Sequence, residues 1–162
     1  MNSKTLAVQF HFTHNVFNRN VQGISHEDSI RLPQAGGNCL NWVAGHITAT
    51  RDALLGILGE SPVWTAESKS KYVRGSARWT NGNDAEKLET ILERFEESQK
   101  KLVDRIHRLD ASALSAPVPQ EKNAFGVDNL GELIATFAFH ESYHVGQTGI
   151  LRRFLGMEGA IK

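Results

Sequence analysis

Apolar residues recur every three to four positions in four long stretches of the chain, which is the period of an amphipathic helix. The four stretches are residues 3–22, 38–58, 83–109 and 128–155. At the start of the third stretch, Asn83 and Glu86 have the spacing of a capping box, and Gly156 is placed to end the fourth. No stretch alternates apolar and polar residues well enough to predict a strand.

Each predicted helix has an apolar stripe that must be buried, and a four-helix bundle buries all four stripes together. The connection formed by residues 59–82 is long enough to run the length of a bundle, whereas an antiparallel turn needs only about 2–8 residues. We therefore expect a crossover here, with helices two and three parallel and helix four antiparallel to helix two. No internal repeat or linker divides the chain, so residues 1–162 are predicted to form one all-α domain.

Charge and composition exclude several classes of partner. Eighteen basic side chains balance eighteen acidic ones, so the net charge gives no long-range attraction for nucleic acid. No apolar run approaches the ~20 residues of a membrane span, and the N-terminus lacks the apolar region of a signal peptide. The single cysteine, Cys39, cannot form an internal disulfide. We therefore expect a cytoplasmic protein that binds neither nucleic acid nor a membrane.

The fourth predicted helix contains the sequence FHESYHVGQ, in which His140 and His144 stand four positions apart. Residues at this spacing project from one face of a helix, and the neighbouring apolar residues place that face toward the interior. An incidental pair of histidines with local hydrogen bonds would have the same spacing. A third histidine, His46, lies on the inward stripe of the second helix, and its height matches that of the pair if the two helices are antiparallel.

Three imidazoles that meet in an apolar interior can satisfy their ring nitrogens together by binding one divalent metal ion. The predicted metal ligands are therefore His46, His140 and His144. Three protein ligands leave a coordination position for water or substrate, which is typical of a catalytic metal site. Imidazole suits Zn and Ni, with Fe and Cu as further candidates, so the residue types do not fix the metal.

The same stretch matches H-E-x-x-H, the pattern of zinc proteases in which the glutamate is a general base. Such a protease takes its third ligand downstream, but only Gln147 and Glu158 follow His144 as candidates, and no predicted strand would hold a peptide. We therefore expect Glu141 to orient an imidazole or to face solvent, and Gln147 to support the site from outside the ligand set. No catalytic residue is assigned from the sequence.

The segment NWVAGHI…RDALLGILG, together with FHESYHVGQTGILRRFLG, resembles the DinB-like superfamily. This superfamily of metal-binding helical bundles includes YfiT-like proteins, bacillithiol and mycothiol S-transferases and relatives of maleylpyruvate isomerase. The resemblance spans nearly the whole chain and is most specific at His46, His140 and at the H-x-G-Q run of His144, Gly146 and Gln147. It implies that the three histidines bind the metal, that the second crossover of the bundle is long, and that the protein forms a homodimer.

From this resemblance we expect a metal-dependent enzyme of the S-transferase type that activates a low-molecular-weight thiol and acts on a small-molecule substrate. The alternatives are a non-catalytic metal-binding or stress-related protein and a metal-dependent hydrolase. The predicted crossover also carries four basic residues, Lys69, Lys71, Arg74 and Arg78. We expect them to be solvated, or else to bind the carboxylates of an anionic cosubstrate or an acidic partner.

Overall fold

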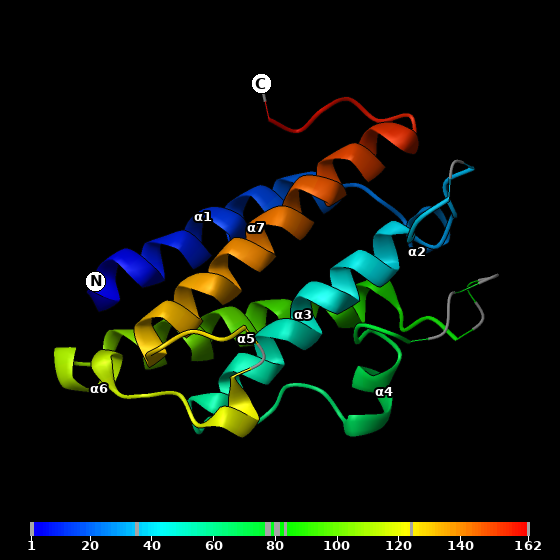
Figure 1. Cartoon of the computed structure of the whole chain (residues 1–162). Helices are drawn as coiled ribbons and strands as arrows, with labels where there is room; N and C mark the ends of the chain where they lie inside the picture. The colour runs from blue at the N-terminus through cyan, green and yellow to red at the C-terminus, as the bar shows by residue number, and fades with distance from the viewer. Residues whose placement is uncertain are drawn as a thin grey trace.

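Four long helices form the fold in the computed structural model, which describes residues 2–34, 36–76, 79, 82, 84–123 and 125–161. The long helices are α1 (Ser3–Val21), α3 (Leu40–Ile57), α5 (Leu88–His107) and α7 (Leu130–Phe154). Shorter helical segments connect them: α2 (His26–Ser29), α4 (Ala66–Ser70), α6 (Ala111–Ser115) and a 3-10 turn (Gln120–Lys122). The predicted all-α four-helix bundle is confirmed (Figure 1).

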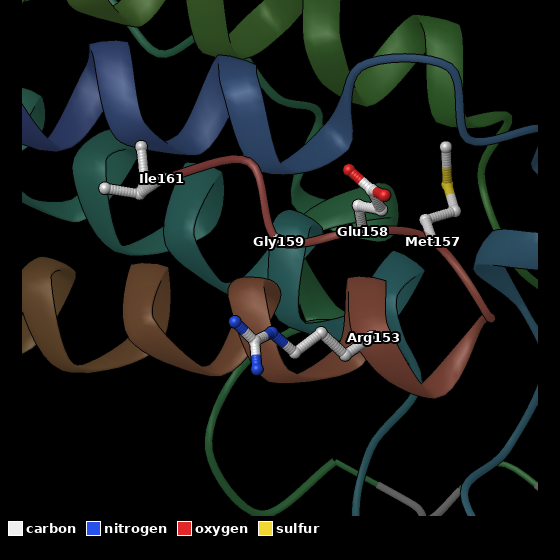
Figure 2. Close-up of a pocket in the computed structure, with 5 residues that line it drawn as sticks. All are labelled: Arg153, Met157, Glu158, Gly159 and Ile161. Atoms are coloured by element: carbon white, nitrogen blue, oxygen red, sulfur yellow. The ribbon is translucent and has the colours of Figure 1, made fainter.

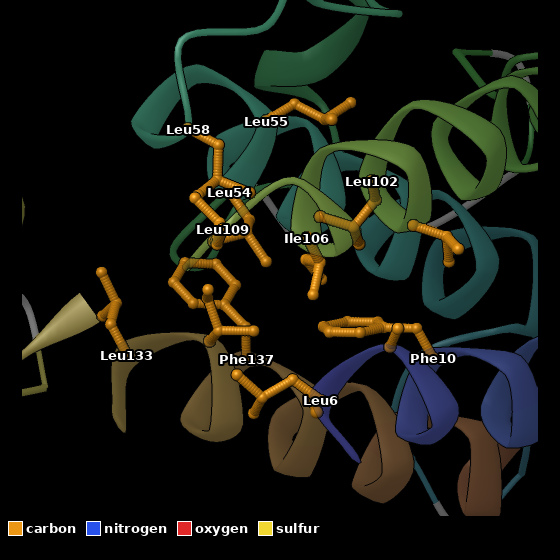
Figure 3. Packing of buried hydrophobic residues seen from close by; sticks show 14 of the residues in the cluster. Leu6, Phe10, Leu54, Leu55, Leu58, Leu102, Ile106, Leu109, Leu133 and Phe137 are labelled. Atoms are coloured by element: carbon orange, nitrogen blue, oxygen red, sulfur yellow. The ribbon is translucent and has the colours of Figure 1, made fainter. Parts of the chain in front are cut away.

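Helix ends that pack into the same buried cluster lie at the same end of the bundle, and this gives the relative directions of the helices. One buried cluster joins the N-terminal halves of α1 and α7 to the C-terminal halves of α3 and α5 (Figure 3). Its members include Leu6, Phe10, Leu54, Leu102, Ile106, Leu133 and Phe137. Helices α3 and α5 are therefore parallel and α7 is antiparallel to α3, which confirms the predicted crossover between the second and third long helices (Figure 1).

A second buried cluster fills the opposite half of the bundle and includes residues of the crossover. Its members include Phe17, Val43, Ile47, Tyr72, Ile91, Phe95 and Val145. Tyr72 packs directly against Gly45 of α3, where any side chain would overlap its ring. The Tyr72 hydroxyl also bonds to Asn41 of α3 and accepts the N–H of Glu86. The crossover is thereby held against α3 close to His46.

The third long helix begins later than the sequence predicted. Helix α5 starts at Leu88, and Asn83 lies outside the described residues. The carboxylate of Glu86 accepts hydrogen bonds from Ser68 at 2.8 Å and from Lys71 at 3.2 Å, both in the crossover. The prediction that Glu86 completes a capping box is therefore wrong. Glu86 lies before the first residue of the helix, and its carboxylate is bound by Ser68 and Lys71 of the crossover.

The last long helix ends where it was predicted to end. Gly156 has a φ of 83°, a left-handed conformation that glycine favours, and its N–H donates to the Arg153 carbonyl. The chain then turns back along α7 (Figure 1). An open hollow of about 440 Å³ lies there, lined by Arg153, Met157, Glu158, Gly159 and Ile161 (Figure 2). This hollow contains no histidine. Among the described residues, no helix is both long enough and apolar enough to cross a membrane.

Candidate metal centre

The three predicted ligands meet where α3 and α7 pack against each other near the middle of the bundle. His140 Nε2 lies 3.3 Å from His46 Nε2 and 3.2 Å from His144 Nε2. The potential ligand atoms of all three residues lie within 4.8 Å of one another. His46 is buried, whereas His140 and His144 are half-buried. The antiparallel arrangement of α3 and α7 thus brings the three side chains to one level, as the spacing along the helices predicted.

Hydrogen bonds at the outer nitrogens orient two of the three rings. His46 Nδ1 lies 2.7 Å from the Tyr72 carbonyl oxygen, and His144 Nδ1 lies 2.8 Å from Gln147 Oε1. Both oxygens only accept, so each Nδ1 carries the proton and each Nε2 presents a lone pair toward the centre. The predicted supporting role of Gln147 therefore has a specific contact. The buried Nδ1 of His140 has no hydrogen-bond partner among the described residues.

The surroundings keep the imidazoles neutral. Burial, together with the smaller electrostatic effects of His144 and His46, lowers the pKa of His140 to about 4. Burial also lowers the pKa of His46 and of His144, although the bonds to Tyr72 and Gln147 act in the opposite direction. Neutral imidazole is the form that binds a metal, so the site is prepared for binding at neutral pH.

The spacing of the nitrogens fits a divalent ion. In a tetrahedral zinc site with Zn–N bonds of about 2.0–2.1 Å, neighbouring ligand nitrogens are separated by about 3.3 Å. The separations of 3.3 Å and 3.2 Å around His140 Nε2 agree with this value. A shared proton would satisfy only one pair of nitrogens, whereas a metal ion satisfies all three. The residues present therefore fit a bound divalent metal.

Glu141, which lies between His140 and His144 in the sequence of α7, points into the core and not toward the histidine cluster. Its carboxylate accepts hydrogen bonds from Arg51 Nε at 2.6 Å and from Arg51 Nη2 at 2.7 Å. It also accepts the hydroxyl hydrogen of Thr13. The side chains of Arg51 and Glu141 are 1% and 3% exposed, and the guanidinium lies 3.9 Å from the centre of the Phe95 ring. This ion pair connects α3 to α7, and the hydrogen bond from Thr13 connects α1 to the same carboxylate.

The expectation that Glu141 orients an imidazole or faces solvent is therefore wrong. A buried carboxylate needs a charged partner, and Arg51 supplies one from the core side of α3. With its carboxylate held by Arg51, Glu141 is not placed to act as the base of a zinc protease. Arg51 was not predicted as the partner, although the two charged residues that begin the otherwise apolar segment RDALLGILG, Arg51 and Asp52, were a signal that buried partners existed.

Comparison with known proteins agrees with the fold. The family model described as the DinB superfamily matches residues 9–148. The chain belongs to the DinB superfamily. It is also similar in structure to a conserved protein from Enterococcus faecalis, with a TM-score of 0.73, 12% sequence identity, and coverage of 96% of this chain and 98% of that one. At that identity the likeness shows a shared fold alone. A search of curated proteins found no match.

The histidine cluster of this DinB superfamily chain opens into a cavity of about 1070 Å³. Aromatic side chains form much of its wall. Trp42 stacks on the His46 ring at a centroid distance of 4.9 Å, and Tyr143 meets the His144 ring edge-on at 5.1 Å. Phe125 and Phe139 also line the cavity and are largely exposed. A ligand at the histidines would therefore lie between apolar, mainly aromatic surfaces.

The basic residues of the crossover do not act as one group in this DinB bundle. Lys69 Nζ lies 2.8 Å from the buried carboxylate of Asp52, and Lys71 Nζ lies 3.2 Å from Glu86. These two lysines attach the crossover to the bundle. Arg74 alone of the described basic residues lines the histidine cavity. The fourth predicted member, Arg78, lies outside the described residues.

The remaining histidines and the cysteine lie apart from this centre. His11 and His107 are exposed, and His14 binds Glu96 at 2.9 Å. Cys39 is buried at the N-cap of α3, and burial raises the pKa of its thiol. A buried, protonated thiol is a poor nucleophile and a poor metal ligand, so Cys39 has a packing role.

Proposed function

We propose that this DinB superfamily protein binds a divalent metal ion through His46, His140 and His144 and acts as a metal-dependent transferase on a low-molecular-weight thiol. The observation that supports the proposal most is the convergence of three imidazoles, with His140 Nε2 3.2–3.3 Å from the Nε2 atoms of the other two, beside an open cavity. Three protein ligands leave a position for a thiol, and the cavity leaves room for the second substrate.

The residues of the chain hold and orient the reacting groups. A bound divalent ion would lower the pKa of a coordinated thiol, so that the thiolate forms at neutral pH. Tyr72 and Gln147 hold two of the rings in the tautomer that presents Nε2. The aromatic walls of the cavity offer an apolar surface to an electrophile.

The absence of an acidic side chain favours thiol transfer over hydrolysis. Among the described residues that line the cavity none is a carboxylate, and Glu141 is held in the core by Arg51. Hydrolysis at neutral pH usually uses a general base to take a proton from water. A thiol needs less help, because its pKa is already close to neutral and the charge of the metal lowers it further.

The experiment is an assay of the zinc-loaded and nickel-loaded protein with cysteine or 2-mercaptoethanol and a chromogenic electrophile. The proposal predicts turnover that requires the added thiol and stops when a chelator removes the metal. Turnover of ester or peptide substrates without a thiol would indicate a hydrolase. Stoichiometric metal without turnover of any tested pair would favour a non-catalytic metal-binding role. The homodimer and the cytoplasmic location stay predictions from the sequence.

A further inference from the structure

The histidine cavity is lined by positive charge without a balancing negative charge among the described residues. Arg74 is the single charged side chain among the described residues that line it. The nearest acidic neighbour of the ligands along α7, Glu141, is already neutralised by Arg51 within the core. A divalent ion held by three neutral imidazoles would add two positive charges that no carboxylate of the described lining balances. A cavity of this kind is electrostatically matched to a ligand with more than one negative charge.

The crossover lysines, Lys69 and Lys71, cannot share this role. Lys69 and Lys71 bind Asp52 and Glu86, and neither lysine lines the cavity. Arg74 follows them in the same segment, beyond the point where Tyr72 fastens the crossover to α3. The backbone that carries Arg74 is therefore fixed only two residues away, at the carbonyl that orients His46.

We propose that Arg74 binds the carboxylate of an anionic thiol whose sulfur lies at the histidine centre. This inference rests on the proposed function and names its substrate class. The ligand is a small carboxylate-bearing thiol, with one negative charge near the three imidazoles and a second at the guanidinium. Arginine suits this role because its planar guanidinium donates two parallel hydrogen bonds to one carboxylate. The apolar part of the ligand would lie along Trp42 and Tyr143.

The size of the cavity agrees with such a ligand. Its volume of about 1070 Å³ lies just above the range for small-molecule sites, about 300–1,000 Å³. The thiol and its electrophilic partner can therefore occupy it together. Arg74 is exposed, so its attraction for a carboxylate is partly screened by solvent and depends on salt. We therefore expect a moderate preference that weakens as the salt concentration rises.

The test compares two series of thiols on the cobalt-loaded protein, in which thiol binding changes the visible absorption of the metal. One series is ω-mercaptocarboxylates of increasing chain length, and the other is the matching mercaptoalcohols. Wild type should bind the best carboxylate about three- to tenfold more tightly than its alcohol at low salt. In about 1 M salt, where the Debye length is about 3 Å, most of this preference should be lost.

Variants assign the preference to one side chain. Arg74→Gln should abolish the preference for carboxylates while leaving the affinity for the alcohols and the cobalt content unchanged. Arg74→Lys keeps the charge without the bidentate geometry, so it should retain part of the preference for carboxylates. Arg108→Gln removes the same charge from an exposed arginine outside the cavity and should behave like wild type.

The outcomes separate this inference from the proposed function. Equal affinity for acids and alcohols in wild type, or an unchanged preference in Arg74→Gln, would overturn the inference and leave the proposed metal-dependent thiol chemistry intact. Failure of the protein to bind cobalt, or of any thiol to change the cobalt spectrum, would overturn the proposed function and the inference with it. Loss of cobalt in Arg74→Gln would also contradict the inference, because Arg74 would then support metal binding and not thiol binding.

Discussion

Replacing Glu141 with glutamine should destabilise the metal-free protein by about 3–5 kcal/mol, the cost typical of breaking one side of a buried ion pair. Both partners are almost fully buried, and Arg51 donates two short hydrogen bonds to the carboxylate. Glutamine preserves the size of the side chain and one acceptor oxygen. It removes the negative charge, so the guanidinium of Arg51 stays buried without a counterion.

The magnitude can be checked against the individual contacts. Each hydrogen bond to a charged group contributes about 1.5–3 kcal/mol, so the two bonds from Arg51 account for about 3–6 kcal/mol. The amide oxygen of glutamine can remake one of them, which favours the lower end of the predicted range. A loss of this size is a large share of the about 5–15 kcal/mol that stabilises a typical domain.

Urea unfolding followed by far-UV circular dichroism, in the presence of a chelator, measures the effect. The matched control is Glu97→Gln, which removes a surface carboxylate that lies 2.7 Å from Lys101 one helical turn away. That side chain is 54% exposed, and its loss should change stability by less than about 0.5 kcal/mol. Replacing Arg51 and Glu141 together with apolar residues should recover much of the stability that the single change removes.

Two results would refute this reasoning. One is a loss of less than about 1 kcal/mol in Glu141→Gln, which would mean that the buried pair is not held as the structure shows. The other is an equal loss in Glu141→Gln and Glu97→Gln. A general-base role makes a different prediction, since the variant would then keep its stability and lose only activity.

Three further predictions follow from the contacts around the histidines. Gly45→Ala should lower stability by about 1–3 kcal/mol in a thermal unfolding experiment, because the added methyl group would overlap the Tyr72 ring. Gln147→Ala should weaken zinc affinity about 10–100-fold in a competition titration, because it removes the acceptor that orients His144. Metal-free protein should lose stability as the pH falls from about 6.5 to about 4, because the pKa of His140 is lowered by burial and the unfolded chain takes up the proton first.

Two of these predictions have a control in the same chain. Gly56→Ala lies in the same helix with nothing near the added atom, so it should be neutral or stabilising. An equal loss in both glycine variants would contradict the overlap with Tyr72. His140→Ala should flatten the pH dependence of urea unfolding, whereas exposed His107→Ala should not. Unchanged zinc affinity in Gln147→Ala would show that the bond to His144 has no role in binding.

Local periodicity was sufficient to predict the long helices and the common level of the three histidines. Apolar stripes record which face of a helix is buried, and the length of the crossover determined which helices run in parallel. Together these placed His46 opposite His140 and His144 before any contact was known. The histidine cluster was predictable because its position depends on helix geometry alone.

The features that were missed depend on partners far away in the sequence. Glu141 and Arg51 are separated by most of the chain, and periodicity could not show that the carboxylate points to the core. Glu86 was assigned to a helix cap because its partners in the crossover, Ser68 and Lys71, could not be foreseen. For the same reason Lys69 and Lys71 were expected to be solvated or to bind a ligand, whereas they pair with Asp52 and Glu86.

The metal content of the purified protein tests the central claim most directly. Elemental analysis of protein loaded with zinc and then dialysed should give about one ion per chain. His46→Ala, His140→Ala and His144→Ala should each lose most of this metal, because each removes one of three bonds, while His11→Ala should retain it. An unchanged metal content in all three variants would contradict the account, since the converging imidazoles would then not be the site that binds the ion.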